Sequence, residues 1–214
     1  MSDTSTDSPH PERKYRLSPA IGLMVSLVLF HLLFQIISLP EKSFLIGSLS
    51  VIPKAVFAGE WWRLLSGCFL HANWSHLGSN LFGLLIFGNL LEPVIGGRAT
   101  LLLLLLSGVL GNLLSCFLMP PDTLSIGASG MVYGLTGAYI CLMVILQRRL
   151  DALRPSGAPK KSAGQLRGAI ILLVVFIALH SQEPQMNLWA HLGGLATGIL
   201  FTPLWLSQNK TEPA

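Results

Sequence analysis

Long apolar runs separated by polar connections extend over most of the chain. Each run approaches the roughly 20 residues that a helix needs to cross the ~30 Å hydrocarbon core of a bilayer, and none carries Asp, Glu, Lys or Arg in its central part. The pattern predicts an all-α polytopic membrane protein with six transmembrane helices. These helices are predicted to cover approximately Ser18–Leu39, His76–Leu91, Thr100–Met119, Ser129–Leu146, Leu166–His180 and Ala190–Leu206.

The composition agrees with this pattern. Half of the residues are apolar (51%) and 11% are charged, whereas a soluble domain carries roughly a quarter charged residues. The net charge of +4 does not indicate nucleic-acid binding, because the basic residues lie between the apolar runs and not along one helix face. The three cysteines have no paired or metal-binding spacing, so we expect no disulfide framework, no metal and no cofactor.

The basic residues predict the orientation in the membrane. With the N-terminus inside, the inner segments carry eleven of the 14 Lys and Arg residues and the outer segments carry the other three. Because cytoplasmic loops are enriched in Lys and Arg, both termini are predicted to be cytoplasmic. The chain then divides into a polar N-terminal tail (1–17), a membrane domain (18–206) and a short C-terminal tail (207–214).

The first outer segment, Pro40–Ser75, is long and yet rich in apolar and aromatic residues, among them Trp61 and Trp62. An aqueous loop would be polar, whereas Trp favours the membrane interface. We therefore expect this segment to lie partly embedded in the outer leaflet.

A serine among glycines begins the fourth predicted helix. In Gly127-Ala128-Ser129-Gly130, the glycines let another backbone or a substrate come close. The free N–H groups at a helix N-terminus could donate to an oxyanion beside Ser129. Serines in membrane helices more often pack as small residues or bond to their own backbone, so this motif alone leaves both interpretations open.

A histidine begins the sixth predicted helix, which starts at the same outer face as the fourth. Ser129 and His191 are therefore expected at similar depth, where the imidazole could act as a general base, although a histidine at a helix start is more often a cap. Gly194 and Gly198 form a GxxxG spacing that lets helices pack closely. Tyr133 lies four residues after Ser129 on the same helix face, where it could pack against the imidazole.

A third polar set begins the second predicted helix, again at the outer face. His76 and Asn80 are four residues apart and share one helix face. Both are donor types that can stabilise an oxyanion, and one such donor contributes about 2.7–4 kcal/mol in the transition state. The competing interpretation is metal binding by His71 and His76, but a third ligand is not apparent and their five-residue spacing does not suit one helix face.

The order and spacing of these motifs closely resemble those of rhomboid proteases. The matching residues are Trp62-Arg63, His71, His76, Asn80, Gly127-x-Ser129-Gly130-x-x-Tyr133 and Ala190-His191-Leu192-x-Gly194-x-x-x-Gly198. The resemblance extends from about Pro40 to Leu206 and implies a six-helix rhomboid-like bundle. It also implies a Ser129–His191 dyad without Asp, which would cleave single-pass membrane proteins at or near the outer membrane boundary.

The same resemblance implies roles for further residues. The oxyanion-hole or supporting residues would be His76, Asn80, Gly127 and Tyr133. The structural residues would be Trp62, Arg63, Glu92, Gly194 and Gly198. Among these, Arg63 would hold the embedded outer segment by hydrogen bonds, and the two glycines would let the sixth helix contact the fourth.

The alternative functions are a rhomboid-like binding protein and a transporter or channel. A catalytically inactive rhomboid-like protein that binds membrane clients shares the fold but normally lacks the Ser or the His. A transporter or channel would show charged residues at mid-membrane or broken helices in repeated halves, and the sequence contains neither. The sequence also lacks the HExxH motif of a zinc metalloprotease. His31 and Gln35 in the first predicted helix are expected to form interhelical hydrogen bonds. The compact chain without a targeting segment indicates a bacterial inner membrane.

Overall fold

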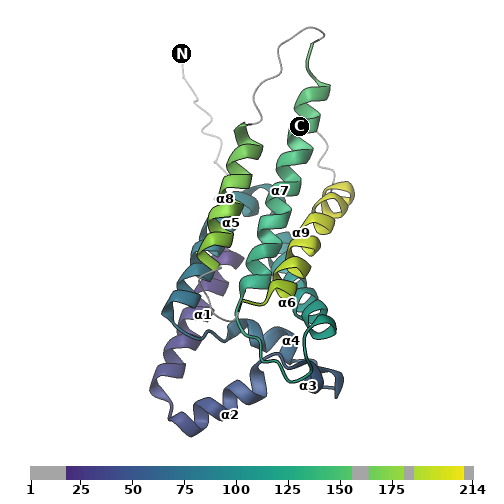
Figure 1. Ribbon diagram of the computed structural model, residues 1–214. Helices are drawn as coiled ribbons and strands as arrows, with labels where there is room; N and C mark the ends of the chain where they lie inside the picture. Colours follow the sequence, from purple (N-terminus) through teal and green to yellow (C-terminus); the bar gives the residue numbers. More distant parts are fainter. Residues whose placement is uncertain (1–17, 156–163, 181–185, 210–214) are drawn as a thin grey trace, which may run out of the picture.

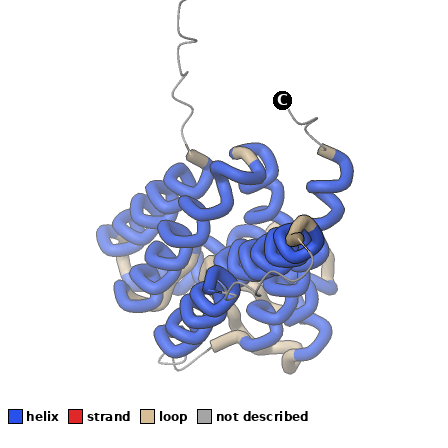
Figure 2. Tube along the Cα trace, turned by 90° about the horizontal axis from the view of Figure 1, so that it is seen from above, coloured by secondary structure: helices blue, strands red, loops and turns tan. Residues whose placement is uncertain are grey.

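The structure, a computed structural model, describes residues 18–155, 164–180 and 186–209. Over these ranges the chain is a bundle of helices (Figures 1 and 2). Strand-like pairing in the described ranges is confined to a single antiparallel bridge between Val51 and Ser125. The expected all-α fold is therefore confirmed, whereas the expected N-terminal tail (1–17) and the last five residues (210–214) of the expected C-terminal tail (207–214) lie outside the described residues.

Six of the described helices are long. They are α1 (Pro19–Ile36), α5 (Trp74–Ile95), α6 (Gly97–Leu118), α7 (Ser129–Ala152), α8 (Gly164–His180) and α9 (Leu188–Gln208). Each corresponds to one of the predicted apolar runs, and most extend beyond it by a few residues. Four of them, α1, α5, α6 and α7, are long and apolar enough to cross a membrane.

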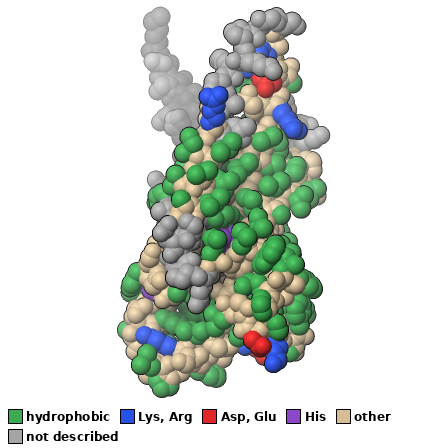
Figure 3. Space-filling model, viewed as in Figure 1, with side chains coloured by type: hydrophobic (Ala, Val, Ile, Leu, Met, Phe, Trp, Pro, Cys, Tyr) green, Lys and Arg blue, Asp and Glu red, His purple; other side chains and the backbone are tan. Residues whose placement is uncertain are grey.

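Charged side chains are separated from the apolar surface of the bundle. In Figure 3 the Lys, Arg, Asp and Glu side chains on the visible face gather near the two ends of the molecule, and the surface between them is mainly apolar. Many large apolar side chains of the long helices are exposed, such as Leu29 on α1 and Leu200 on α9. An exposed apolar band between charged ends is the arrangement that a bilayer requires.

The predicted outer segment, Pro40–Ser75, is largely helical. It contains α2 (Leu39–Leu49), α3 (Pro53–Phe57), α4 (Arg63–Ser66) and the 3-10 helix η1 (Gly67–Phe69). In Figure 1, α2, α3 and α4 lie at one end of the bundle, and α2 runs across that end.

The first helix ends earlier than predicted because a second one begins. Ser38 and Glu41 form a capping box: the Ser38 side chain accepts from the Glu41 N–H, and the Glu41 carboxylate accepts from the Ser38 N–H at 2.9 Å. These hydrogen bonds hold the pKa of Glu41 below its ordinary value. The local cap, which the apolar run conceals, therefore separates α1 from α2.

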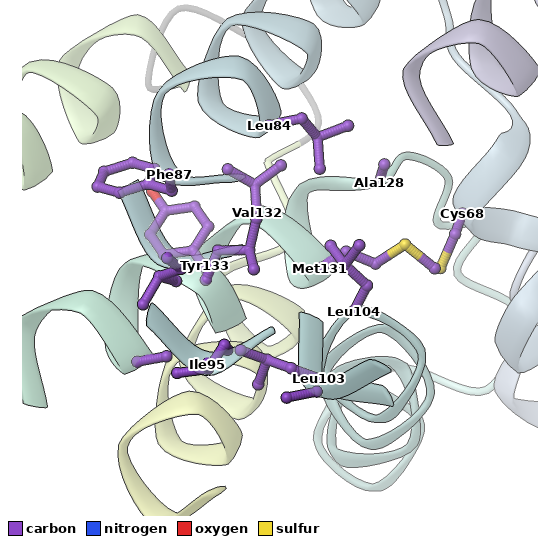
Figure 4. Packing of buried hydrophobic residues seen from close by; sticks show 14 of the residues in the cluster. Cys68, Leu84, Phe87, Ile95, Leu103, Leu104, Ala128, Met131, Val132 and Tyr133 are labelled. Atoms are coloured by element: carbon purple, nitrogen blue, oxygen red, sulfur yellow. The ribbon is translucent and has the colours of Figure 1, made fainter. Parts of the chain in front are cut away.

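The centre of the bundle is formed by α6, α7 and α9. The largest interface joins α7 to α9, and α9 also packs along α6. The main apolar core lies where α7 meets α5 and α6, and Figure 4 shows Met131 and Tyr133 of α7 within it, together with Phe87 of α5 and Leu104 of α6. By contrast, α1 packs mainly on α5.

The polar pair in α1 behaves differently from the expectation. His31 and Gln35 lie 3.2 Å apart within the same helix, so their mutual hydrogen bond is not interhelical. His31 reaches α5 through ring contact, because its imidazole meets the Trp74 ring edge-on at a centroid distance of 4.5 Å. The spacing of four residues, which places both side chains on one helix face, allows them to bond to each other.

Candidate active site

Ser129 and His191 meet where α7 and α9 begin. Ser129 is the first residue of α7 and His191 lies in the first turn of α9. The Ser129 Oγ and His191 Nε2 atoms are 2.7 Å apart, and the two residues are only 6% and 4% exposed. The chain thus brings together, across 62 positions, the two side chains whose common depth was predicted.

The close approach of α7 and α9 depends on glycine. A Cβ added to Gly194 would overlap the carbonyl oxygen of Gly130, and one added to Gly198 would overlap that of Gly134. The two backbones are therefore in direct contact at both levels. Larger residues would push α9 away from α7 and separate the Ser129–His191 pair.

Tyr133 covers one face of the catalytic candidate His191. The two rings are stacked with centroids 4.2 Å apart and an angle of 13° between their planes. Tyr133 is itself 5% exposed and belongs to the apolar core. A fixed tyrosine ring therefore restricts the rotation of the imidazole that faces Ser129.

His76 lies against the backbone just before Ser129. Gly127 has φ +117°, a conformation that residues with a Cβ rarely adopt, and a Cβ at this position would lie 2.6 Å from His76 Nε2. The Gly127 N–H donates to the Gly67 carbonyl at 2.9 Å. Both its backbone conformation and the space taken by His76 thus require glycine at 127.

Asn80 is fully buried in α5, one turn after His76. Its Nδ2 donates to the His76 carbonyl at 2.9 Å. Asn73 caps the start of the same helix by accepting from the His76 N–H at 2.7 Å. Both backbone polar groups of His76 are therefore engaged, which holds its backbone in place at the start of α5.

His71 contacts the serine-bearing segment directly, a role that the sequence did not reveal. Its Nε2 lies 3.4 Å from the Ala128 nitrogen, whose N–H donates to it, and its Nδ1 lies 3.3 Å from the Phe69 carbonyl oxygen. A neutral imidazole with its hydrogen on Nδ1 satisfies both contacts. The rings of His71 and His76 are 5.0 Å apart, but within the described ranges no three His, Cys, Asp or Glu residues gather in a way that could hold a metal ion.

Arg63 ties the outer segment together from a buried position. Its guanidinium lies 2.6 Å and 2.7 Å from the Glu60 carboxylate and donates to the carbonyls of Gly47 and Ser50 at 2.7 Å and 2.9 Å. Trp62 adds a weaker hydrogen bond, at 3.3 Å, to the Ser48 carbonyl. The planar guanidinium thus joins α4 to the end of α2.

Glu92 lies far from these residues, near the other end of α5. Its carboxylate accepts a hydrogen bond from the Ser18 hydroxyl, which also caps α1. Glu92 therefore connects α1 to α5 at the end of the bundle where α5 turns into α6, and it does not contact the Ser129–His191 pair through any described hydrogen bond.

A small cavity of about 310 Å³ opens beside the start of α9. Its lining residues are Met119, Thr123, Leu124, Ser125, Met186 and Asn187. Asn187 is the N-cap of α9, and its side chain accepts from the Ala190 N–H at 3.0 Å. An Asn immediately before an apolar helix is a recognisable N-cap signal, and it places the helix start two residues before the predicted Ala190.

A hydrogen-bonded Ser–His pair buried among apolar helices of membrane-spanning length belongs to an integral membrane protein with a hydrolase-like site. The family model for the rhomboid domain matches residues 58–208, and the chain belongs to the rhomboid family. The expected family is therefore confirmed.

Individual relatives agree with this membership. The chain is 31% identical over 198 residues to YdcA of Bacillus subtilis, which is provisionally named a rhomboid protease, and the match covers 91% of this chain and 92% of YdcA. It is also 31% identical to the rhomboid protease GluP of B. subtilis over 65% of this chain and 25% of GluP. A chloroplastic rhomboid-like protein of Arabidopsis thaliana, number 11, is 31% identical over 68% of this chain and 52% of its own length. The chain thus spans nearly all of YdcA but about half or less of these two longer relatives.

Proposed function

We propose that the protein is an intramembrane serine endopeptidase in which Ser129 is the nucleophile and His191 the general base. The observation that carries this proposal is the 2.7 Å hydrogen bond between Ser129 Oγ and His191 Nε2 in a buried site. Membership of a family that includes a named rhomboid protease supports it further.

The pair can move a proton without a third acidic group. His191 Nε2 accepts the hydroxyl proton, so the neutral imidazole carries its hydrogen on Nδ1. Ser129 Oγ attacks the carbonyl carbon of the scissile peptide bond as that proton moves to Nε2. The imidazolium then gives the proton to the leaving amine, and the neutral imidazole next activates the water that hydrolyses the acyl-enzyme. The stacked Tyr133 ring would hold the imidazole in the orientation that an Asp provides elsewhere.

The developing oxyanion requires donors close to Ser129. The backbone N–H of Ser129 at the start of α7, the His76 imidazole and the Asn80 amide are the proposed donors. The contact of His76 with the Gly127 backbone supports this assignment, because it places the imidazole immediately before the nucleophile. The residue Gly127 would act by leaving room for that approach.

The proposed substrate is a single-pass membrane protein cut at or near its outer boundary. The proposed catalytic residues come from the starts of α5, α7 and α9, at the end of the bundle that also carries the outer segment. A scissile bond near the membrane surface could reach this end, whereas one at mid-bilayer could not.

The proposed topology has six crossings with both termini cytoplasmic, so the membrane domain spans 18–206 between two short tails. The helices α8 and α9 contain 17 and 21 residues, which gives lengths of about 26 Å and 32 Å at 1.5 Å per residue. The packing of α9 along α6 and α7 supports its crossing with them. Lys and Arg are in excess in the segments predicted to lie on the same side of the membrane as the N-terminus, which supports the cytoplasmic orientation of both termini. The proposed location is a bacterial inner membrane.

Cleavage of a model single-pass substrate by the purified protein tests the mechanism. We expect Ser129→Ala and His191→Ala each to lower the rate by about 10⁴-fold or more. The matched control is Ser26→Ala, because the Ser26 hydroxyl bonds to the Gly22 carbonyl of its own helix α1 and lies far along the chain from the site. Cleavage by Ser129→Ala at the wild-type rate would overturn the proposed nucleophile.

If no form cleaves the model substrate, labelling of Ser129 by a fluorophosphonate separates the two remaining cases. Labelling that requires both Ser129 and His191 would identify a protease with narrow substrate specificity. A folded protein whose Ser129 does not react would instead be a catalytically inactive rhomboid-like protein that binds membrane clients.

A further inference from the structure

Asn187 uses its whole side-chain amide in hydrogen bonds. Its Oδ1 accepts from the Ala190 N–H at 3.0 Å, and its Nδ2 donates to the Ser115 Oγ at 2.6 Å and to the Ser125 Oγ at 2.7 Å. The residue is 7% exposed. One acceptor and two donors are all engaged in a buried place, where an unmet polar group would be costly.

The two serines belong to different parts of the molecule. Ser115 lies in the last turn of α6, where its hydroxyl also contacts the Met119 sulfur at 3.0 Å. Ser125 lies in the connection that leads to α7, and its backbone exchanges two hydrogen bonds with Val51, at 2.9 Å and 3.0 Å. Asn187 therefore fastens the start of α9 to two segments that are themselves held in place.

Asn187 and Ser125 each lie four residues before one member of the proposed catalytic pair. Ser125 precedes Ser129 by four residues, and Asn187 precedes His191 by four residues within one helical turn, where the His191 N–H donates to the Asn187 carbonyl at 3.2 Å. A single side chain thus bridges the two segments that present Ser129 and His191, close to where these meet.

We propose that Asn187 is a positioning residue that sets the distance and orientation of His191 relative to Ser129. This inference rests on the proposed function of that pair. Capping alone does not require asparagine, because Ser, Thr or Asp can cap a helix equally well. The pair of donors to Ser115 and Ser125 does require an amide, since a serine at this position has one hydroxyl and an aspartate carboxylate has no hydrogen to donate.

The test compares Asn187→Ser with Thr202→Val as a matched control. Asn187→Ser keeps a cap for α9 but removes both donors. Thr202 is a buried residue of the same helix whose hydroxyl bonds to the Gly198 carbonyl, well beyond the site, so its replacement by valine perturbs α9 without touching the bridge. For each protein we would measure the rate of fluorophosphonate labelling at Ser129, kcat and KM for a model substrate, and the midpoint of thermal unfolding.

We expect Asn187→Ser to lower the labelling rate and kcat by about 10- to 100-fold, because small misplacements of reacting groups have effects of this size, with KM changed less than about twofold. Ser125→Ala should lower both rates in the same direction but by less. Thr202→Val should label at the wild-type rate even if its unfolding midpoint falls as far as that of Asn187→Ser.

Two results would overturn the inference alone: wild-type labelling of Asn187→Ser, or equal losses of labelling in Asn187→Ser and Thr202→Val. In both cases the proposed function would still stand, provided that the wild-type protein is labelled at Ser129 and that this labelling requires His191. A wild-type protein that is not labelled at Ser129 overturns the proposed function and, with it, the positioning role.

Discussion

The contacts between α7 and α9 and those between α1 and α5 show two ways of packing helices in one molecule. Two thirds of the apolar stretch of α7 is buried (67%), against 17% for α1. Glycines put the α7 and α9 backbones in direct contact, whereas α1 and α5 leave an apolar cavity of about 440 Å³ between their side chains.

The difference follows from what each interface must hold. Between helices surrounded by lipid, association comes from close packing and hydrogen bonds, because lipid is as apolar as a leucine side chain. The interface that bears Ser129 and His191 uses both, and it therefore fixes positions closely. The α1 interface relies mainly on side chains that lipid can replace, so it should tolerate changes that the other cannot.

The largest effect should come from Gly198→Ala, because the new Cβ would overlap the Gly134 carbonyl oxygen and lie 2.7 Å from the Ala138 nitrogen. We expect a loss of about 3 kcal/mol in the free energy of unfolding, measured by thermal or denaturant unfolding in detergent. Gly168→Ala in α8 is the matched control, since a Cβ there has no neighbour within 4 Å, and it should be neutral or stabilising by up to about 1 kcal/mol. Equal stabilities of the two variants would break the comparison.

Loss of a buried polar contact should come next. Asn112 of α6 donates to the Leu64 carbonyl at 2.8 Å and so fastens α4 to the bundle. Asn112→Leu would leave that buried carbonyl without this donor and should lower the unfolding free energy by about 2 kcal/mol. Gln35→Met in α1 removes only a bond to His31 within the same helix, and a cost similar to that of Asn112→Leu would show that the two regions do not differ in their use of hydrogen bonds.

The smallest effects are expected within α1 itself. Leu27 is fully buried and Leu29 is 61% exposed. Leu27→Ala should lower the unfolding free energy by about 1 kcal/mol, below the range of 2–5 kcal/mol for soluble cores, because the loosely packed side chains of α1 and α5 can close over the space that it leaves. Leu29→Ala should cost less than about 0.5 kcal/mol, since its side chain exchanges one apolar surrounding for another. A loss of several kcal/mol for Leu27→Ala would place α1 with the closely packed helices.

The long helices could be predicted from the sequence because their signal is a continuous apolar run. The small helices α3 and α4 could not, since they contain five and four residues, too few for a helical period. Hydrogen bonds from Arg63 to carbonyls 13 and 16 positions away hold this region, and such partners are not visible in a local pattern.

The residues of the candidate site also differ in whether the sequence could predict them. Ser129 and His191 could be paired in advance because the topology placed two helix starts at one face. The Tyr133 stacking followed from a spacing of four residues on one helix. His71 and Asn187 could not be assigned, because their partners Ala128, Ser115 and Ser125 lie 57 to 72 positions away and are brought close only by the completed fold.

The separation of Ser129 from His191 by 62 positions has a consequence for biosynthesis. A ribosome synthesises α7 well before α9, so a growing chain contains the serine long before the histidine that it meets. The last described helix, α9, must also pack against α6 and α7, where glycine backbones are in close contact, before the two side chains touch. In the proposed mechanism, an unfinished chain would therefore carry a serine that cannot yet be activated, and activity would begin only after α9 has packed in place.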